Sequence, residues 1–214
     1  GLNEWDANLC SIETDLSSLG GVFGGTFSAP NLLVDKDGIA TELYPADNDE
    51  VWELDPVRGE AVYGTTDVTF WCALPQEGGA DCVEGNPDGK PFCAPFPVIF
   101  YAHGYGGSRA EISLHIGRHT AMGYAMCGLD SYGHGLNRFL YGDTPESLGV
   151  QLAFQRFGSD GVRELAGLMM AGRDRDLNND GLPDPGMDMW TNDVFHTRDM
   201  VRQSVLEEVQ FVRI

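Results

Sequence analysis

Basic residues are scarce in this chain. Its 214 residues include 13 Lys and Arg against 33 Asp and Glu, which gives a formal net charge of −20 at pH 7. A surface of that sign repels the phosphates of nucleic acids and anionic membranes. No nucleic-acid partner is therefore expected, and bound cations would relieve part of the self-repulsion.

Long apolar runs are absent as well. No stretch reaches 18 apolar residues, so no membrane span is expected. Because 42% of the residues are hydrophobic and 10% are aromatic, the chain can bury a sizeable core, and we expect one domain over residues 1–214. The chain begins with Gly and shows no signal peptide, which predicts a processed or engineered N-terminus.

The chain also lacks Cys-x-x-Cys spacing, which argues against a zinc knuckle. Three of its five cysteines lie close together in a segment rich in Gly, Pro and Asn, a pattern typical of disulfide-stapled loops in exported proteins. We expect one or two disulfides among Cys10, Cys72, Cys82 and Cys93, with the pairing open. Cys127 lies in an apolar segment and is expected to be a small core residue.

Glycine is concentrated where the sequence is most informative. Val98–Ala102 is a short apolar run, typical of a strand buried on both faces. His103–Gly107 follows, with three glycines in four residues. Ser108 and Glu111 then form a capping-box pattern that predicts a helix start. A glycine turn between a strand and a helix directs backbone N–H groups at one point, which suits an oxyanion, a phosphate or a carboxylate. The alternative is a tight link that binds no ligand.

An apolar strand followed by His-Gly-x-Gly-Gly resembles the third strand and oxyanion loop of the α/β-hydrolase family. Downstream, Gly123–Asp130 resembles the next parallel strand, and Ser131–Gly135 resembles the Gly-His-Gly turn of that family. The two motifs cover about residues 97–137. A looser likeness to secreted bacterial esterases and lipases extends to the last helix.

The resemblance implies an α/β fold, the N-terminal part of an α/β-hydrolase sheet. Antiparallel opening strands would come first, with strand-like material over 60–74, and a parallel strand-helix-strand unit would follow. The crossover helix is expected over 109–122, ended by Gly123. Residues 1–30 are expected to be loop-like, because glycine pairs interrupt them.

Three further segments are predicted to be loops or insertions. Residues 75–96 form a cysteine-containing loop with Cys82 and Cys93. Residues 138–172 contain two helical patterns and form a possible lid or insertion. Their apolar side chains are expected either to face a lid or to pack on the core: Leu165, Leu168, Met169 and Met170. Residues 173–190 form an acidic loop.

The last helix is expected over about 198–213, capped by Thr197. Valines recur along it at spacings of four, four and three, which predicts one apolar face. These are Val201, Val205, Val209 and Val212. We expect a sheet to cover this face.

By the resemblance, the backbone N–H of Tyr105 is one oxyanion donor, and Gly104 and His103 support the turn. His134, in the second turn, is expected to make structural hydrogen bonds. His115 and His119 have the spacing of a metal pair, but no third ligand is evident, so packed or surface histidines are favoured.

The acidic loop also resembles EF-hand-like and thrombospondin type-3-like calcium loops. Oxygen side chains alternate before a glycine, and calcium prefers six to eight such hard ligands. The best register begins at Asp176, and Met187 replaces the usual Glu at position twelve. The candidate ligands are Asp174, Asp176, Asn178, Asp180, Asp184 and the carbonyl of Leu182. The alternative is a solvated acidic turn.

A serine nucleophile in its usual context is missing. None of the ten serines lies in Gly-x-Ser-x-Gly, and Ser108, the nearest, lies too far past its strand. The resemblance therefore implies the N-terminal segment of an exported serine esterase or lipase. Its triad would lie on a missing C-terminal segment, or on one that partners this chain as a second polypeptide. The substrate would be a small ester or lipid, and the location secreted, periplasmic or at the cell surface. A non-catalytic interaction or structural module on the same fold is the alternative.

Overall fold

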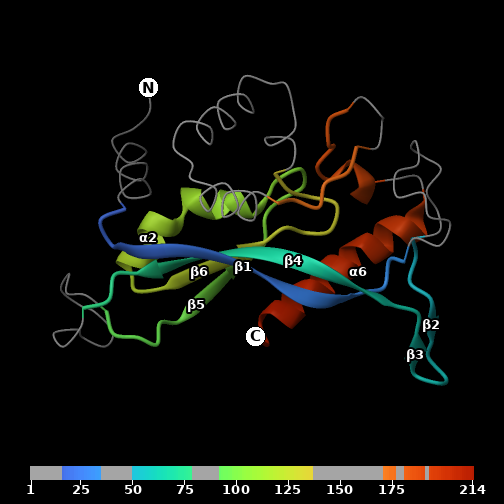
Figure 1. The fold of residues 1–214 in the computed structure, drawn as a ribbon, viewed down its shortest axis with the longest axis horizontal. Coiled ribbons are helices and arrows are strands. Elements are labelled where there is room, and N and C mark those ends of the chain that lie inside the picture. The colour runs from blue at the N-terminus through green and yellow to red at the C-terminus, as the bar shows by residue number, and fades with distance from the viewer. Residues whose placement is uncertain (1–15, 35–49, 79–91, 137–170, 177–180, 191–192) are drawn as a thin grey trace, which may run out of the picture. The chain divides into compact units, whose positions relative to one another are not determined.

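A computed structural model describes residues 16–34, 50–78, 92–136, 171–176, 181–190 and 193–214 (Figure 1). Several expectations lie outside these residues. They are most of the 75–96 cysteine loop, all but the end of the 138–172 insertion with its apolar residues, and the candidate ligands Asn178 and Asp180.

Among the described residues, the main sheet has four strands in the order β1-β4-β6-β5, which are labelled in Figure 1. These strands are β1 (Leu19–Asn31), β4 (Gly64–Pro75), β6 (Ala125–Leu129) and β5 (Val98–Tyr101). β5 and β6 are parallel, with Val98 opposite Ala125, and a helical connection joins them. A separate antiparallel pair consists of β2 (Leu54–Asp55) and β3 (Glu60–Ala61). The predicted parallel strand-helix-strand unit is confirmed, and the fold class is α/β.

The first strand corrects the prediction of a loop over residues 1–30. β1 runs through Gly20 and Gly24 because a partner strand, not local propensity, orders it. Gln76, just after β4, donates its N–H to the carbonyl of Ser18 at 2.8 Å. A β-carbon at Gly20 would lie 2.4 Å from the carbonyl oxygen of Pro75, so glycine permits this close approach.

The burial of the two parallel strands differs from the prediction for residues 98–102. Every residue of β6 is buried, whereas Val98 and Phe100 of β5 are exposed. The reason is position: β6 lies between two strands, and β5 is the last strand of the order. A short apolar run thus occurs both in β5, the edge strand, and in β6, the central strand, and does not distinguish them.

The chain divides into two compact units. The first comprises Gly1–Gly24, Phe70–Ala102 and Arg109–Gly128, and the second comprises Gly25–Thr69, His103–Ser108 and Leu129–Ile214. β1 and β4 contribute residues to both.

The first unit is built around four buried side chains: Ala73, Ile112, Ile116 and Met126. Two of them come from the connection between the parallel strands, which consists of the 3-10 helix η2 (Arg109–Leu114) and the helix α2 (Ile116–Ala121). The single helix predicted over 109–122 is thus divided, although Gly123, with φ of +81°, follows it as expected. Glu111 accepts a hydrogen bond from the Tyr101 hydroxyl at 3.0 Å, so it does not form the predicted capping box with Ser108.

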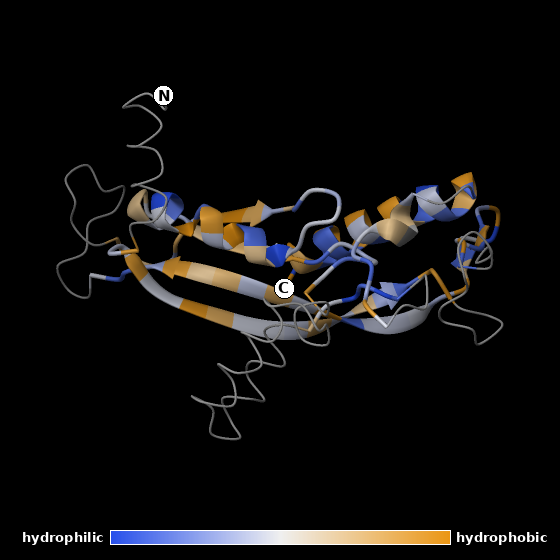
Figure 2. Cartoon of the chain, turned by 90° about the horizontal axis from the view of Figure 1, so that it is seen from above, coloured by the Kyte–Doolittle hydropathy of each residue, from blue (hydrophilic) through white to orange (hydrophobic). Residues whose placement is uncertain are grey.

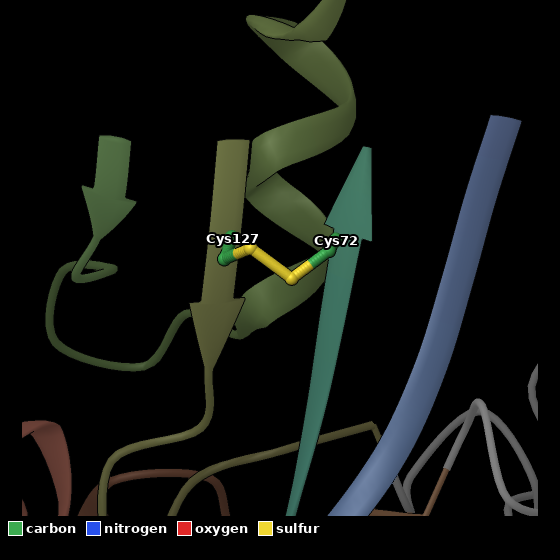
Figure 3. Close-up of a disulfide and its surroundings, with 2 residues drawn as sticks. All are labelled: Cys72 and Cys127. Atoms are coloured by element: carbon green, nitrogen blue, oxygen red, sulfur yellow. A yellow bond between two sulfur atoms is a disulfide. The ribbon is translucent and has the colours of Figure 1, made fainter. Parts of the chain in front are cut away.

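A disulfide joins two strands of the first unit. Cys72 of β4 and Cys127 of β6 are bonded, with Cα atoms 4.1 Å apart (Figure 3). Cys127 is buried as expected, but leaving it out of the expected disulfides was wrong, because the strand order places it on the strand next to that of Cys72. Cys93 is also disulfide-bonded.

The second unit contains the short 3-10 helix η3 (Met187–Met189) and the long helix α6 (Val194–Phe211). The cap of α6 is Asp193, whose carboxylate accepts the N–H groups of Phe195 and His196. Asp193 thus replaces the predicted cap Thr197, which lies within the helix, and α6 begins four residues earlier than expected.

The face of α6 that packs inward is polar, which reverses the prediction. His196, Asp199, Gln203 and Glu207 are fully buried, whereas the four valines are 42% to 60% exposed. Hydrophilic and hydrophobic residues alternate along this helix in Figure 2.

Hydrogen bonds explain the buried polar face, since each group has a partner from elsewhere in the unit. Gln203 accepts from the N–H of Leu32 at 3.0 Å and donates to the carbonyl of Pro30 at 2.8 Å. Asp199 accepts the N–H of Trp52 at 3.0 Å. The valine face is left without a covering sheet among the described residues.

No described helix combines the length and the apolar composition that crossing a membrane requires.

Candidate functional site

The glycine turn after β5 presents free backbone donors. The N–H of Gly107 donates to the carbonyl of Gly104 at 3.0 Å, and Gly106 has φ of +71°, a conformation that favours glycine. Within the described part of the chain, the N–H groups of Tyr105 and Gly106 have no hydrogen-bond acceptor. Two adjacent donors are therefore available to an anionic oxygen.

His103 connects this turn to the turn after β6. Its Nε2 accepts the N–H of Ser131 at 2.9 Å, and its Nδ1 lies 2.8 Å from the carbonyl of Gly104. One neutral tautomer, with the proton on Nδ1, satisfies both contacts. The ring occupies the position that a bracing role requires. With Nε2 already accepting this N–H, the ring is not placed as a general base.

His134 lies in the second turn and is only 1% exposed. Its Nδ1 hydrogen bonds with the carbonyl of Tyr132 at 3.0 Å, which fixes the proton on Nδ1 in the neutral ring. Its Nε2 is buried without a hydrogen-bond partner among the residues described. Burial lowers the pKa of His134, and the neighbouring His103 lowers it further, which favours the neutral form.

Gly186 joins the two turns to the end of the acidic loop. Its N–H donates to the carbonyl of Gly133 at 2.8 Å, and its φ is +78°. A β-carbon here would lie 2.5 Å from Nε2 of His134 and 3.0 Å from the backbone nitrogen of Gly106. Gly186 was not among the site residues predicted from the sequence. Its Pro-Gly context signals a turn but not the contacts of that turn.

Four aromatic rings contact one another in succession, and we call them the aromatic row: His103, His134, Tyr105 and Trp190. Ring centroids are 5.0 Å apart for His103 and His134, and 6.1 Å for His134 and Tyr105. Tyr105 and Trp190 are also 6.1 Å apart, with 62° between their planes. At one end of this row both rings are exposed: Tyr105 is 60% and Trp190 is 59% exposed. Sequence reasoning missed Trp190.

The described part of the calcium-type loop has a closed conformation. Asp176 accepts the N–H of Gly181 at 2.8 Å, and Gly181 has φ of +89°. The N–H of Asp184 donates to the carbonyl of Arg175 at 2.7 Å, so the two ends of the loop meet. Leu182 lies between them. Carboxylate and carbonyl oxygens are the ligand type that calcium prefers.

Asp174 lies apart from this arrangement. It is 6% exposed, and its Oδ1 lies close to the backbone of Gly135 and Gly172. No group of three His, Cys, Asp or Glu side chains suited to a metal occurs among the described residues.

Two ion pairs hold the irregular segment 171–176, which leads into the loop. Arg173 makes a two-pronged pair with Glu207 of α6, including Nη2 to Oε1 at 2.9 Å, and its guanidinium lies 4.5 Å from the Tyr132 ring centroid. Arg175 pairs in the same way with Glu50, at 2.7 and 3.0 Å. Both carboxylates are buried, so breaking either pair would leave an uncompensated charge.

The remaining candidates are structural where they are described. His119 contacts the carbonyl of His115 at 2.8 Å through Nδ1, and the two rings are 6.4 Å apart. Ser108 is 7% exposed, and its hydroxyl has no hydrogen bond to a described histidine.

The chain matches no protein-family model, no curated protein and no solved structure.

Proposed function

We propose that this chain supplies the oxyanion loop of an exported serine ester hydrolase. The single observation that carries the proposal is the pair of free N–H groups at Tyr105 and Gly106, on a glycine turn that follows a parallel strand. In ester hydrolysis through an acyl-enzyme, negative charge develops on the carbonyl oxygen. Each well-placed N–H donor lowers the barrier by about 3 kcal/mol.

The surroundings of the turn support this role. The carboxyl ends of parallel neighbouring strands lie at one edge of a sheet, and His103 links the turns that follow β5 and β6. The donors are thus held by hydrogen bonds and by packing against His134 and Gly186 before any substrate binds. Pre-ordered donors need no reorganisation at the moment of reaction.

The nucleophile, base and acid belong, in this proposal, to a C-terminal segment on the same or a separate polypeptide. Such a segment would also cover the exposed edge strand β5, with Val98 and Phe100, and separately the valine face of α6. The substrate is a small ester or lipid.

Calcium, where bound, stabilises the loop that begins at Asp176. The carboxylates of Asp176 and Asp184 would hold it together with the carbonyl of Leu182, and with Asn178 and Asp180 from outside the described residues. Its role is structural, because it would pin an acidic loop whose end, at Gly186, packs against the oxyanion turn.

Export is supported by the Cys72–Cys127 disulfide, since such bonds persist in oxidising compartments.

Fluorophosphonate labelling of the native preparation tests the proposal. The reagent phosphonylates an activated serine, and the labelled species is identified on a denaturing gel and by intact mass. We expect label outside these 214 residues, on a C-terminal segment or a second polypeptide. Label at Ser108 would contradict the assignment. A heat-denatured sample is the control.

A non-catalytic interaction module is the second candidate. It is favoured by the exposed valine face of α6 together with the lack of a serine in a Gly-x-Ser-x-Gly context. A folded preparation that takes no label on any species would favour this function.

A further inference from the structure

The exposed end of the aromatic row includes Tyr105, the residue that also carries one of the free donors. Tyr105 carries both a backbone N–H without an acceptor among the described residues and a ring that contacts the buried His134. Trp190, at the end of the acidic loop, contacts the same ring. Neither exposed ring is left to swing freely, because each has at least one aromatic neighbour within 6.1 Å.

The angle between the two exposed rings defines what they can hold. With 62° between their planes, the rings of Tyr105 and Trp190 meet edge to face and do not form a parallel stack. A flat ligand ring placed against both side chains would stack on one aromatic ring and meet the edge of the other. Both geometries are favourable for aromatic pairs at centroid distances of about 4.5–7 Å.

We infer that Tyr105 and Trp190 form a binding site for the aromatic ring of a neutral aryl ester or amide, with its carbonyl oxygen on the N–H groups of Tyr105 and Gly106. The inference rests on the proposed function for the placement of the carbonyl. It extends that function by naming the substrate class.

Two further observations favour a neutral, flat group. The net charge of −20 disfavours anionic aryl compounds such as free aromatic acids. Ring and donor also belong to one residue, so a ligand that places its carbonyl on the Tyr105 N–H brings its neighbouring atoms to the Tyr105 ring. An aryl carbonyl has its ring at that position.

Binding of non-hydrolysable probes to the native preparation tests the inference without requiring catalysis. N-methylbenzamide carries a neutral carbonyl next to an aromatic ring. N-methylcyclohexanecarboxamide has the same carbonyl and a similar size, but it is not flat. Each is titrated into ¹⁵N-labelled protein, and the indole N–H of Trp190 and the backbone N–H of Tyr105 and Gly106 are followed by NMR.

We expect the benzamide to shift all three signals and to bind at least about fivefold more tightly than the cyclohexyl probe. Trp190→Ala should weaken benzamide binding about tenfold, whereas Val57→Ala, at a 94% exposed position of the β2–β3 connection, should not change it. Both side chains are exposed, so both variants should fold, which circular dichroism checks. Equal affinity for the two probes, unchanged affinity of Trp190→Ala, or no shift at millimolar probe would overturn the inference.

The ester hydrolase and the aryl site can be refuted independently of one another. Benzamide bound at Trp190 in a preparation that no fluorophosphonate labels would refute the ester hydrolase and leave the aryl site. A labelled preparation in which both probes bind equally would refute the aryl site and leave the hydrolase.

Discussion

Glu208 on α6 makes stability depend on pH in an unusual direction. Burial, and to a lesser extent the charge of neighbouring Glu207, raise its pKa from 4.5 to about 7. Its Oε1 is buried without a hydrogen-bond partner in the described part of the chain. We predict that Glu208→Gln stabilises the protein at alkaline pH and has little effect at acid pH.

The sign follows from proton linkage. Between pH 4.5 and about 7 the native state keeps a proton on Glu208 that the unfolded state has released, so the free energy of unfolding falls as the pH rises. At about 1.36 kcal/mol per pH unit, the full penalty is about 3 kcal/mol. Because Glu208 is partly exposed, solvent screening reduces the full penalty, which is reached at pH 8.5, to roughly 2 kcal/mol. At pH 5 the carboxyl of the unfolded chain has only begun to lose its proton, so the penalty is about 0.5 kcal/mol.

Urea unfolding of both proteins at pH 5, 6, 7 and 8.5 measures this difference. The matched control is Glu60→Gln on β3, an exposed glutamate whose replacement should change the free energy of unfolding by less than about 0.5 kcal/mol at every pH. A Glu208→Gln difference that is the same at pH 5 and pH 8.5 would refute the reasoning, since a pH-independent effect cannot come from the carboxyl proton.

Three further predictions concern the two units separately. Gly186→Ala should abolish labelling and destabilise the protein by at least about 2 kcal/mol, because its β-carbon would meet His134 and its φ is positive; unchanged labelling would sink the packing argument. Replacing Cys72 and Cys127 with alanine should lower the free energy of unfolding by up to about 4 kcal/mol, given their separation of 55 residues, and this would appear as a lower urea midpoint. Reduction of the native protein should have the same effect. Calcium should raise the melting temperature, and EGTA or Asp176→Asn should remove that gain; a melting temperature that ignores EGTA would mean that the loop is only an acidic turn.

The parts of the fold that the sequence predicted are those set by local patterns. The apolar segment before Ser131 gave β6, and the dense glycines after Ala102 gave a turn with free donors, because both depend on neighbouring residues alone. β1 was missed for the opposite reason. Its glycines suit a loop locally, and only pairing with β4 orders them.

Long-range partners account for the other errors. The valine pattern of α6 predicted a buried apolar face, but Glu207 and Gln203 are drawn inward by Arg173 and by the backbone of Pro30, which are far away in the sequence. The disulfide of Cys127 was missed because its partner depends on strand order, although its burial was expected. Trp190 could not be placed against Tyr105 for the same reason, since no local signal connects two residues 85 positions apart.

The disulfide between β4 and β6 has a consequence for proteolysis. A cut at any peptide bond between Cys72 and Cys127 leaves the two pieces joined by the sulfur bond, so the chain keeps its mass on a non-reducing gel, apart from one added water. The fragments separate only after reduction. Exposure to a protease in this region would therefore remain invisible until a thiol is added, and comparison of reducing and non-reducing gels distinguishes a nicked chain from an intact one.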